Sequence, residues 1–264
     1  MSTALITGAS SGIGKTFAEK LAAKNTNLII VARSEDKLNT LAKQLQEQYN
    51  IQVNVIVKDL TQPSATQEVF DATQSQGLTV DLLINNAGFG DYGEFAQTDG
   101  DRQVQMVLLN NVALMDLTHK FLPQMRERRS GSIINVSSIA AFQPIPYLSV
   151  YAASKAFVRS FSEALWAENR QYGVRVLVVC PGPTETNFFS EANFPLELAA
   201  NAKSISTPEE VVNQSFKALE EGHATVVVGG IASQFITKLS PIIPRETLLN
   251  ILEKEFKVKG IGNG

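Results

Sequence analysis

Short, continuous apolar runs alternate along this chain with longer segments in which apolar residues recur every three or four positions. The runs are typical of strands buried on both faces, and the longer segments are typical of amphipathic helices. The pattern predicts strands at residues 4–7, 27–32, 52–57, 80–84, 132–136, 174–179 and 225–229. It predicts helices at residues 15–24, 35–49, 63–76, 101–128, 151–172 and 208–221. Because strands and helices alternate, we expect an α/β fold in which a parallel sheet is covered by helices on both faces.

The composition is that of a globular protein and argues against several functional classes. The chain has 264 residues, of which 44% are hydrophobic and 19% charged, and its net charge is −3. This balance lacks the basic footprint of a nucleic-acid-binding protein, so we expect no nucleic-acid partner. The single cysteine, Cys180, excludes an internal disulfide and a thiolate zinc site, and we expect no metal. We find neither a signal peptide nor a run of ~18 apolar residues, and we expect a cytoplasmic protein.

A glycine-rich segment joins the first predicted strand to the first predicted helix. Gly8, Gly12 and Gly14 have the spacing G-x-x-x-G-x-G, which differs from the G-x-G-x-x-G dinucleotide fingerprint. Glycines let the backbone approach a diphosphate closely, and the start of a helix offers free N–H groups and a partial positive charge. The segment therefore predicts a nucleotide phosphate site, and a glycine turn without a ligand is the alternative.

The second predicted strand ends without an acidic residue. An acid at this place in a βαβ unit binds ribose hydroxyls, whereas an arginine suits a 2′-phosphate. Ala32 stands at the strand end and Arg33 follows it. A guanidinium and a phosphate dianion form a strong charge-assisted contact, so we expect NADP rather than NAD. A solvated Arg33 is the alternative, and Lys15 is either a second cation for the phosphate or a solvated charge.

Polar or small residues also follow other predicted strands. Asp59 could hydrogen-bond an adenine amino group or simply begin a helix. The segment Asn85-Asn86-Ala87-Gly88 suits a backbone that passes beside a planar ligand, or side chains that tie neighbouring strands together. Thr184 and Thr186 follow a Pro-Gly turn and could bond a ligand amide. Ligands of open parallel sheets bind beyond the carboxyl ends of the strands, where all these groups are expected.

A tyrosine and a lysine lie one turn apart in the helix predicted from residue 151. Tyr151 and Lys155 are four positions apart and would share one face. A phenol has a pKa of roughly 10, and a nearby ammonium lowers that pKa and makes the phenol a usable proton donor and acceptor. Ser138 ends a strand thirteen residues upstream of Tyr151 and could help to hold a carbonyl oxygen. Taken alone, the Tyr–Lys pair could also be a chance helical pair.

The long helix predicted at residues 101–128 carries an unusual residue in its middle. Asn110 is a mediocre helix former whose side chain could interrupt the backbone ladder and hold a water there. Asn111 is the alternative for that role. The apolar residues predicted to face inward are Val104, Leu108, Leu109, Leu114, Leu117 and Leu122.

Taken together, these motifs resemble those of the short-chain dehydrogenase/reductase family, in its NADP-preferring form. The motifs are Thr7-Gly8-x-x-x-Gly12-x-Gly14, Asn85-Asn86-Ala87-Gly88, Asn110, Ser138, Tyr151-x-x-x-Lys155 and Pro181-Gly182. The resemblance covers residues 3 to about 230. It implies a single Rossmann-like, doubly wound domain whose seven-stranded, mostly parallel sheet has the strand order 3-2-1-4-5-6-7. It also implies an NADP(H)-dependent oxidoreductase that transfers hydride between nicotinamide and a carbonyl or secondary alcohol.

The resemblance implies a catalytic role for four residues. Tyr151 would protonate the carbonyl oxygen, and Ser138 would hydrogen-bond that oxygen. Lys155 would lower the pKa of the tyrosine and bind the nicotinamide ribose. Asn110 would hold a water in a proton relay, and the match around residues 113–118 favours it over Asn111.

The resemblance also implies a set of contacts to the cofactor. Many relatives have a valine where Thr184 stands, which leaves its contact to the nicotinamide open, whereas Thr186 matches the family. The implied contacts are Gly8, Ser10, Ser11, Gly12, Ile13, Gly14, Arg33, Asp59, Leu60, Asn86, Ala87, Gly88, Tyr151, Lys155, Pro181, Gly182, Thr184 and Thr186.

Apolar residues dominate the segments expected around the substrate. Residues 142–148 and 187–196 are rich in aromatic and aliphatic side chains, and Phe89, Tyr92 and Phe95 add to them. An apolar cleft with few polar groups suggests a lipophilic ketone or aldehyde, although these side chains could instead pack the core. We expect residues 187–206 to form a lid that excludes water when it closes.

Residues 231–264 are expected to form a helical extension on the domain of residues 1–230. The extension could cover the cleft, form an interface in a homodimer or homotetramer, or, less favoured, touch a membrane surface. Two alternative functions are a membrane-associated lipid or steroid ketone reductase and a non-catalytic nucleotide-binding regulator. The apolar residues on which these expectations rest are Phe235, Ile236, Leu239, Ile242, Ile243, Leu248, Leu249, Ile251, Leu252 and Phe256.

Overall fold

A computed structural model describes residues 1–200, 205–230, 233–234, 237 and 243–258. Its centre is a sheet of seven strands in the order β3-β2-β1-β4-β5-β6-β7, and every neighbouring pair is parallel. The predicted sheet and strand order are therefore confirmed. The strands are β1 (Thr3–Thr7), β2 (Asn27–Ala32), β3 (Val53–Val57), β4 (Leu82–Asn85), β5 (Gly131–Val136), β6 (Val174–Pro181) and β7 (Thr225–Val228).

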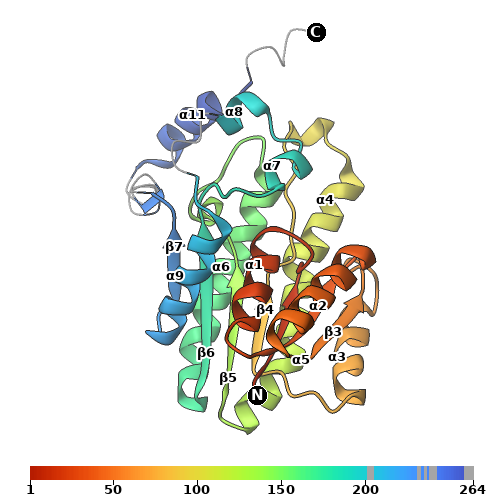
Figure 1. Cartoon of the computed structure of the whole chain (residues 1–264). Coiled ribbons are helices and arrows are strands. Elements are labelled where there is room, and N and C mark those ends of the chain that lie inside the picture. The colour runs from red at the N-terminus through yellow and green to blue at the C-terminus, as the bar shows by residue number, and fades with distance from the viewer. Residues whose placement is uncertain (201–204, 231–232, 235–236, 238–242, 259–264) are drawn as a thin grey trace.

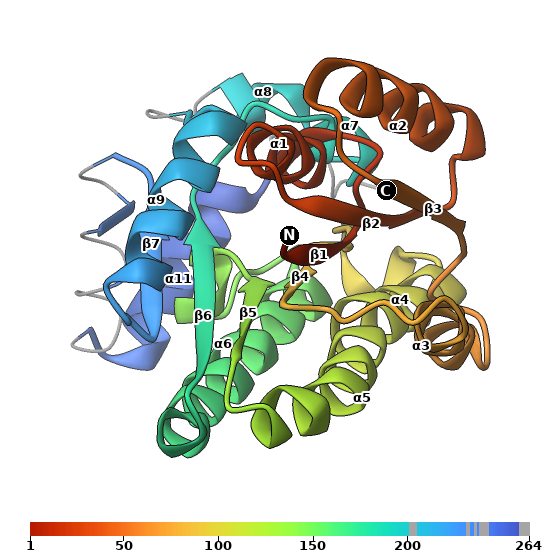
Figure 2. The ribbon, with the colours of Figure 1, turned by 60° about the horizontal axis from the view of Figure 1, so that its bottom comes forward.

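Helices cover both faces of the sheet, as the alternating pattern predicts (Figure 2). One layer consists of α1 (Gly12–Ala22), α2 (Glu35–Tyr49) and α9 (Pro208–Glu220). The other layer consists of α3 (Ala65–Ser75), α4 (Gly100–Val107), α5 (Leu114–Glu127) and α6 (Ser149–Asn169). Each layer buries its apolar stripe against the sheet, and the two resulting cores bury nearly all residues of the central strands β1, β4 and β5.

Among the described residues, three further helices lie beyond the carboxyl ends of the strands, at the top of Figure 1. They are α7 (Phe188–Glu191), α8 (Leu196–Ala200) and α11 (Arg245–Phe256). The described residues also contain short 3₁₀ turns: η1 (Phe95–Gln97), η3 (Ile139–Phe142) and η4 (Arg170–Tyr172). None of the helices in the described part of the chain is long and apolar enough to cross a bilayer.

The helix predicted at residues 101–128 is interrupted in its middle. A π-helical segment, η2 (Leu108–Ala113), separates α4 from α5 and contains Asn110. A π turn holds one residue more than an α turn and shifts the phase of the helix, so a single apolar stripe cannot run through it. The prediction that Val104 faces inward is accordingly wrong: its side chain is 59% exposed, and Gln103 and Met106 are buried instead.

The C-terminal extension is described only in part. Phe235, Ile236, Leu239 and Ile242 lie outside the described residues. In α11, Leu248 and Leu252 are buried, whereas Ile251 is exposed. The Tyr92 hydroxyl donates a hydrogen bond to the backbone carbonyl of Phe256, so the end of α11 is joined to the segment that follows β4. The division of the chain into residues 1–230 and 231–264 stays a prediction.

Candidate active site

Ser138, Tyr151 and Lys155 meet where β5 ends beside α6. Ser138 caps η3 by accepting a hydrogen bond from the Ala140 N–H at 3.1 Å, and its side chain lies near enough to the Tyr151 phenol to lower the pKa of that phenol. The Lys155 Nζ donates to the Val136 carbonyl at 3.1 Å and lies 5.8 Å from the centroid of the Tyr151 ring. Tyr151 and Lys155 are both buried. The structure thus brings together the three residues that the sequence predicts as a proton-transfer site.

Two serine hydroxyls that sequence reasoning missed position this part of α6. The Ser137 Oγ donates to the Lys155 carbonyl at 2.8 Å, which fastens the helix to the end of β5. The Ser154 Oγ donates to the Tyr151 carbonyl at 2.7 Å. The sequence places Ser154 three positions after Tyr151 and Ser137 directly before Ser138. Serine is too common a residue for these spacings to indicate a positioning role.

Burial determines how the Tyr–Lys pair ionises. Burial raises the pKa of the Tyr151 phenol to about 12, and the nearby Ser138 hydroxyl opposes this rise only in part. Burial also lowers the pKa of Lys155 to about 8. The predicted lowering of the tyrosine pKa is therefore not found, because desolvation of the phenolate is the largest influence on it and raises it. At neutral pH the phenol keeps its proton, and this is the form that a proton donor requires.

Asn110 is buried in the π-helical segment and faces the same cluster. Its Oδ1 accepts from the Phe89 N–H at 3.1 Å, and its Nδ2 donates to the Phe89 carbonyl at 2.9 Å and to the Ser154 Oγ at 3.1 Å. Asn111, the alternative, donates from Nδ2 to the Ser154 carbonyl at 2.8 Å. Both amides thus reach α6, and only Asn110 also reaches the segment after β4. The predicted role of Asn110 in holding a water stays a prediction.

In the turn between β1 and α1, the glycine positions have no room for a side chain. Gly8 and Gly12 have φ values of +67° and +50°, which favour glycine. A Cβ on Gly14 would lie 2.3 Å from the Gly8 carbonyl oxygen and 2.5 Å from the Asn86 Nδ2. The sequence-predicted glycines are therefore required by the turn itself.

Asn85, the last residue of β4, and Asn86, which follows it, serve the structure of the sheet and the turn. The Asn86 Nδ2 donates to the Thr7 carbonyl at 3.0 Å, and the Thr7 Oγ1 accepts from the Asn86 and Ala87 N–H groups, both at 3.0 Å. The Asn85 Nδ2 donates to the Thr118 Oγ1 at 3.0 Å and to the Asn135 Oδ1 at 2.9 Å. The alternative that these side chains tie neighbouring strands is confirmed. The backbone from Asn86 through Gly88 still borders the glycine turn.

The start of α1 fits the phosphates of a dinucleotide. The N-cap residue, Ser11, makes no side-chain capping bond within the described structure, and the first turn of α1 contains no acidic residue. The first N–H groups of a helix need partners and carry a partial positive charge, which suits an anion. Thr186 lies opposite: a Cβ on Gly12 would be 3.1 Å from its Cγ2. The segment after β6 therefore borders the same space as the glycine turn.

Arg33 and Asp59 lie near one another at the ends of β2 and β3. Arg33 is exposed, and its charge helps to hold the pKa of Asp59 below its usual value. Partial burial alone would raise the pKa of Asp59, but hydrogen bonds from the Thr61 N–H and Oγ1, at 3.0 and 2.8 Å, outweigh it. Asp59 thus stabilises the turn before α3, and Leu60 beside it is buried. The guanidinium of Arg33 is accessible to a phosphate at this edge.

The two threonines after β6 are less free than the sequence suggests. The Thr184 Oγ1 donates to the Gly182 carbonyl at 2.9 Å, and Thr184 pairs with Ser206 in an isolated parallel bridge. The Thr186 Oγ1 accepts from the Phe188 N–H at 3.2 Å. Pro181 is the last residue of β6 and Gly182 follows it, and the Gly182 N–H donates to the Val228 carbonyl at 2.7 Å. Thr184 therefore stabilises the turn after β6. The Thr186 Oγ1 can still accept a further hydrogen bond beside the glycine turn.

Tyr151 packs in a cluster of apolar residues beyond the strand ends, which we call the apolar wall. The ring of Phe188, in the predicted lid, lies 5.2 Å from the Tyr151 ring. Two of the predicted aromatic residues do not contribute: Phe95 is 65% exposed, and Phe142 packs in a separate cluster with Cys180. Burial raises the pKa of the Cys180 thiol to about 12, so this thiol is a poor nucleophile at neutral pH. The residues that form the wall are Phe89, Tyr92, Met106, Ile145, Tyr147, Leu148, Phe188 and Phe194.

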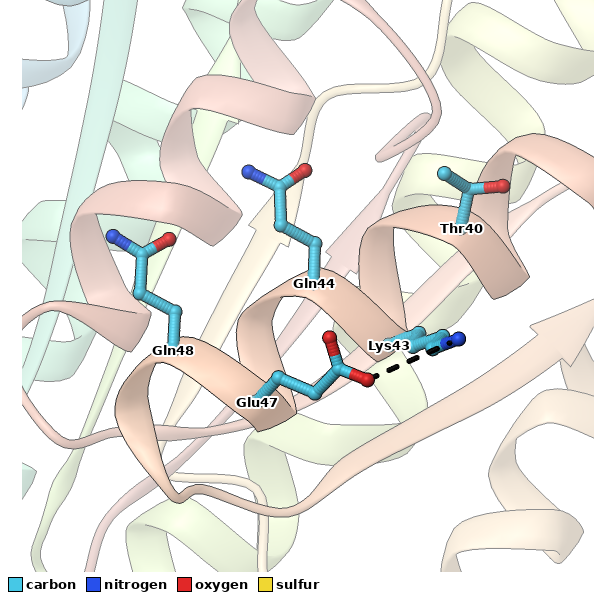
Figure 3. A pocket seen from close by; sticks show the side chains of 5 residues that line it. All are labelled: Thr40, Lys43, Gln44, Glu47 and Gln48. Carbon is cyan, nitrogen blue, oxygen red and sulfur yellow. Dashed lines mark ion pairs between the residues drawn. The ribbon is translucent and has the colours of Figure 1, made fainter.

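A hollow on the outer face of α2 is unrelated to this site. It is lined by Thr40, Lys43, Gln44, Glu47 and Gln48, with the Lys43 Nζ 3.9 Å from the Glu47 Oε1 (Figure 3). These are polar residues of one helix that face solvent, and none of the predicted site residues lines the hollow. The candidate site is therefore the edge where the strands end, not this surface.

Comparison with known proteins agrees with this geometry. The sequence model described as short chain dehydrogenase matches residues 2–195. A very-long-chain 3-oxoacyl-CoA reductase from Anas platyrhynchos is 32% identical over 262 residues, covering 96% of this chain and 80% of that protein. A 7beta-hydroxysteroid dehydrogenase from Collinsella aerofaciens is 34% identical over 227 residues, covering 86% of this chain and 85% of that protein. A short-chain dehydrogenase from Sphingobium yanoikuyae, solved in complex with NADPH, superposes with a TM-score of 0.82 at 28% identity, covering 100% of this chain and 99% of the other.

Proposed function

The chain belongs to the short-chain dehydrogenase family, and from this premise we propose that it is an NADP(H)-dependent oxidoreductase that interconverts a lipophilic ketone or aldehyde and its alcohol. The observation that carries the proposal is the meeting of the Ser138 hydroxyl, the Tyr151 phenol and the Lys155 ammonium inside an apolar wall. A carbonyl oxygen placed there would have two hydroxyl donors and one buried cation near it.

The proposed mechanism assigns a separate task to each of these residues. A bound nicotinamide supplies hydride chemistry. Tyr151, protonated at neutral pH, gives its proton to the carbonyl oxygen, and Ser138 orients that oxygen by hydrogen bonding. Lys155 carries its charge below pH about 8 and stabilises the phenolate that forms. Asn110 keeps the segment after β4 in place and is the proposed holder of a water beside Lys155.

The preference for NADP rests on the charges at the ends of β2 and β3. Arg33 is exposed there, and the strand end itself carries no carboxylate that would favour the ribose hydroxyls of NAD. The relative from Sphingobium yanoikuyae binds NADPH, which supports the same preference. We propose that the cofactor phosphates lie at the start of α1. The residues predicted to contact the other parts of the cofactor lie within Gly8 to Gly14, Asp59 to Leu60 and Asn86 to Gly88.

The substrate class follows from the wall around Tyr151. Aliphatic and aromatic side chains form it, so it favours a substrate that is apolar around the reacting carbonyl. Two relatives are a 3-oxoacyl-CoA reductase and a hydroxysteroid dehydrogenase, and their names point to bulky, lipophilic carbonyl compounds. We therefore propose a 3-oxoacyl thioester or an oxosteroid as the first compounds to try.

The proposal is tested by turnover with a panel of carbonyl compounds. Purified protein is mixed with NADPH or NADH and a 3-oxoacyl thioester, an oxosteroid, an aliphatic aldehyde or a keto sugar, and loss of the reduced cofactor is followed. We expect turnover with at least one lipophilic compound, a higher kcat/KM with NADPH, and little turnover of the keto sugar. Tight NADPH binding without turnover of any compound would instead favour a nucleotide-binding regulator.

Exposed apolar side chains favour one variant of this function, a membrane-associated lipid or steroid ketone reductase. Leu196 in α8 and Ile251 in α11 are 84% and 51% exposed. Both helices lie beyond the carboxyl ends of the strands, on the side of the proposed site (Figure 1). Sedimentation with phosphatidylcholine vesicles tests this variant. A membrane-associated protein sediments with the vesicles, whereas a protein that stays in the supernatant does not bind a membrane through these side chains. Assembly into a homodimer or homotetramer stays a prediction, which gel filtration of the purified protein would test.

A further inference from the structure

Asp91 is a buried carboxylate that joins three segments beside the proposed active site. Its side chain is only 5% exposed. Its Oδ1 accepts from the Arg102 Nε and the Asn193 Nδ2, both at 2.9 Å, and its Oδ2 accepts from the Gln103 Nε2 at 2.7 Å. A carboxylate out of water needs a cation and hydrogen-bond donors around it. We call Asp91, Arg102, Gln103 and Asn193 the Asp91 cluster.

The Asp91 cluster connects the body of the domain with the lid. Arg102 and Gln103 belong to α4, whereas Asn193 follows α7 in the segment predicted to close over the substrate. The Arg102 guanidinium also donates to the Glu191 carbonyl at 2.6 Å, and the Tyr92 N–H donates to the Ala192 carbonyl at 2.8 Å. Residues 191–193 are therefore bonded to the body at three successive positions.

The position of this lid segment determines the space around Tyr151. Phe188, at the start of α7, lies against the Tyr151 ring. A Cβ on Gly90 would lie 2.8 Å from the Phe188 Cζ and 3.3 Å from the Tyr151 Cδ2, so the backbone next to Asp91, the lid and the phenol are in close contact. A shift of the lid by an ångström or so would open or close this contact.

We propose that Asp91 is a positioning residue that holds lid residues 188–194 over Tyr151 and thereby sets the affinity for the carbonyl substrate. The inference rests on the proposed function, because it assigns the lid to that substrate. The hydrogen bonds of the Asp91 side chain go to α4 and Asn193, so its effect on Tyr151 passes through Asn193, Arg102 and the backbone of residues 191–192. If the lid moved away, the carboxylate would lose one donor and Arg102 would lose a carbonyl acceptor.

The sharpest test removes only the lid's contribution to the cluster. Asn193 is exposed and has a φ of +52°, so Asn193→Gly removes the amide donor and keeps a permitted backbone conformation. Asn50→Gly is the matched control: Asn50 also has a φ of +52°, but it lies at the end of α2. Asp91→Ala and the Asp91→Ala/Asn193→Gly double variant complete the set.

We expect hydrogen exchange of a peptide spanning residues 186–194 to become about tenfold faster in Asn193→Gly and Asp91→Ala, with β1 and β5 unchanged. The KM for the best carbonyl substrate should rise about tenfold, and kcat should fall less, because Ser138, Tyr151 and Lys155 stay in place. The double variant should exchange no faster than Asp91→Ala alone, because both changes break the same contact.

Three outcomes would overturn the proposal. If the lid peptide exchanges at the same rate in both single variants as in Asn50→Gly, the cluster does not hold the lid. Faster exchange with an unchanged KM would show that the lid does not set substrate affinity. If the effects of the two single changes on the exchange rate were fully additive in the double variant, Asp91 and Asn193 would act independently of each other. Hydrogen exchange needs no turnover, so a protein that reduces no carbonyl refutes the proposed function while this test of the cluster still gives its answer.

Discussion

The Asn110 side chain and the Phe89 backbone are joined by two hydrogen bonds, one to the N–H at 3.1 Å and one to the carbonyl at 2.9 Å. A single buried amide thus satisfies both polar groups of one residue in the segment after β4. Gly88 lies next to this contact, and a Cβ there would be 2.8 Å from the Asn110 Oδ1 and 3.4 Å from the Lys155 Nζ. Asn110 therefore connects the proposed cofactor side of the site with the proposed catalytic side.

Replacing Asn110 by the isosteric leucine should destabilise the protein. Asn110→Leu leaves the Phe89 N–H and carbonyl without their partner, at a cost of about 1–3 kcal/mol for a buried unsatisfied group. Urea unfolding measures the change in the free energy of unfolding. Asn39→Leu, at an exposed position of α2, is the control and should change that free energy by no more than about 0.5 kcal/mol. Equal changes in the two variants would contradict the structural role of Asn110.

Removing the phenolic hydroxyl of Tyr151 should abolish most of the turnover. General acid catalysis contributes about 10²–10⁴-fold, so kcat of Tyr151→Phe should fall by that factor while NADPH binding persists. Tyr49→Phe, which loses only a hydroxyl that hydrogen-bonds Gln48 on α2, should keep its kcat. Steady-state kinetics with the best substrate of the panel decide the matter. A Tyr151→Phe variant with near-normal turnover would refute the assignment.

Arg33 should determine the choice between the two nicotinamide cofactors. A hydrogen-bonded contact to a charged group is worth roughly 1.5–3 kcal/mol, so kcat/KM for NADPH should fall about 10- to 100-fold in Arg33→Ala. The value for NADH should change little, because NADH has no 2′-phosphate. Arg175→Ala removes an exposed arginine of β6 and serves as the control. Equal losses with NADPH and NADH would contradict a phosphate contact.

Cofactor use should weaken above the pKa of Lys155. Because burial lowers this pKa to about 8, the free enzyme loses the charge of Lys155 as the pH rises through that value. The kcat/KM for NADPH reports the groups of the free enzyme, so it should fall above pH about 8. Lys155→Met should show a lower kcat/KM without this inflection. A wild-type profile that stays flat to pH about 10, near the ordinary lysine pKa, would contradict the lowered value.

A methyl group on Gly14 should disrupt the glycine turn, whereas one on Gly100 should be tolerated. A Cβ on Gly14 would lie 2.3 Å from the Gly8 carbonyl oxygen, but a Cβ on Gly100 would have no neighbour within 4 Å. Thermal unfolding and NADPH fluorescence titration should show that Gly14→Ala is less stable and binds the cofactor weakly. Gly100→Ala, near the start of α4, should match the wild type. Normal NADPH binding by Gly14→Ala would show that the turn can move aside.

Much of the fold and the gathering of the site could be predicted from local patterns. The segments at residues 27–32 and 35–49 have the same bounds in the structure as in the hydrophobic pattern. Ser138, Tyr151 and Lys155 meet because they stand at the end of β5 and on the helix that follows it. The π-helical segment around Asn110 was only suggested, because its geometry depends on hydrogen bonds to Phe89 and Ser154, which are distant in the chain.

Local patterns in the chain specify the alternation of strands and helices, the glycine turn and the residues available to the site, because apolar period and residue type are local properties. Folding, by contrast, sets how those residues ionise and which of their polar atoms are already hydrogen-bonded within the protein. Burial, not Lys155, controls the pKa of Tyr151, and the Thr184 hydroxyl is already bonded to Gly182. The Asp91 cluster also appears only in the folded chain, because its donors come from positions up to 102 residues away. Solvation and contacts between distant segments have no local signature.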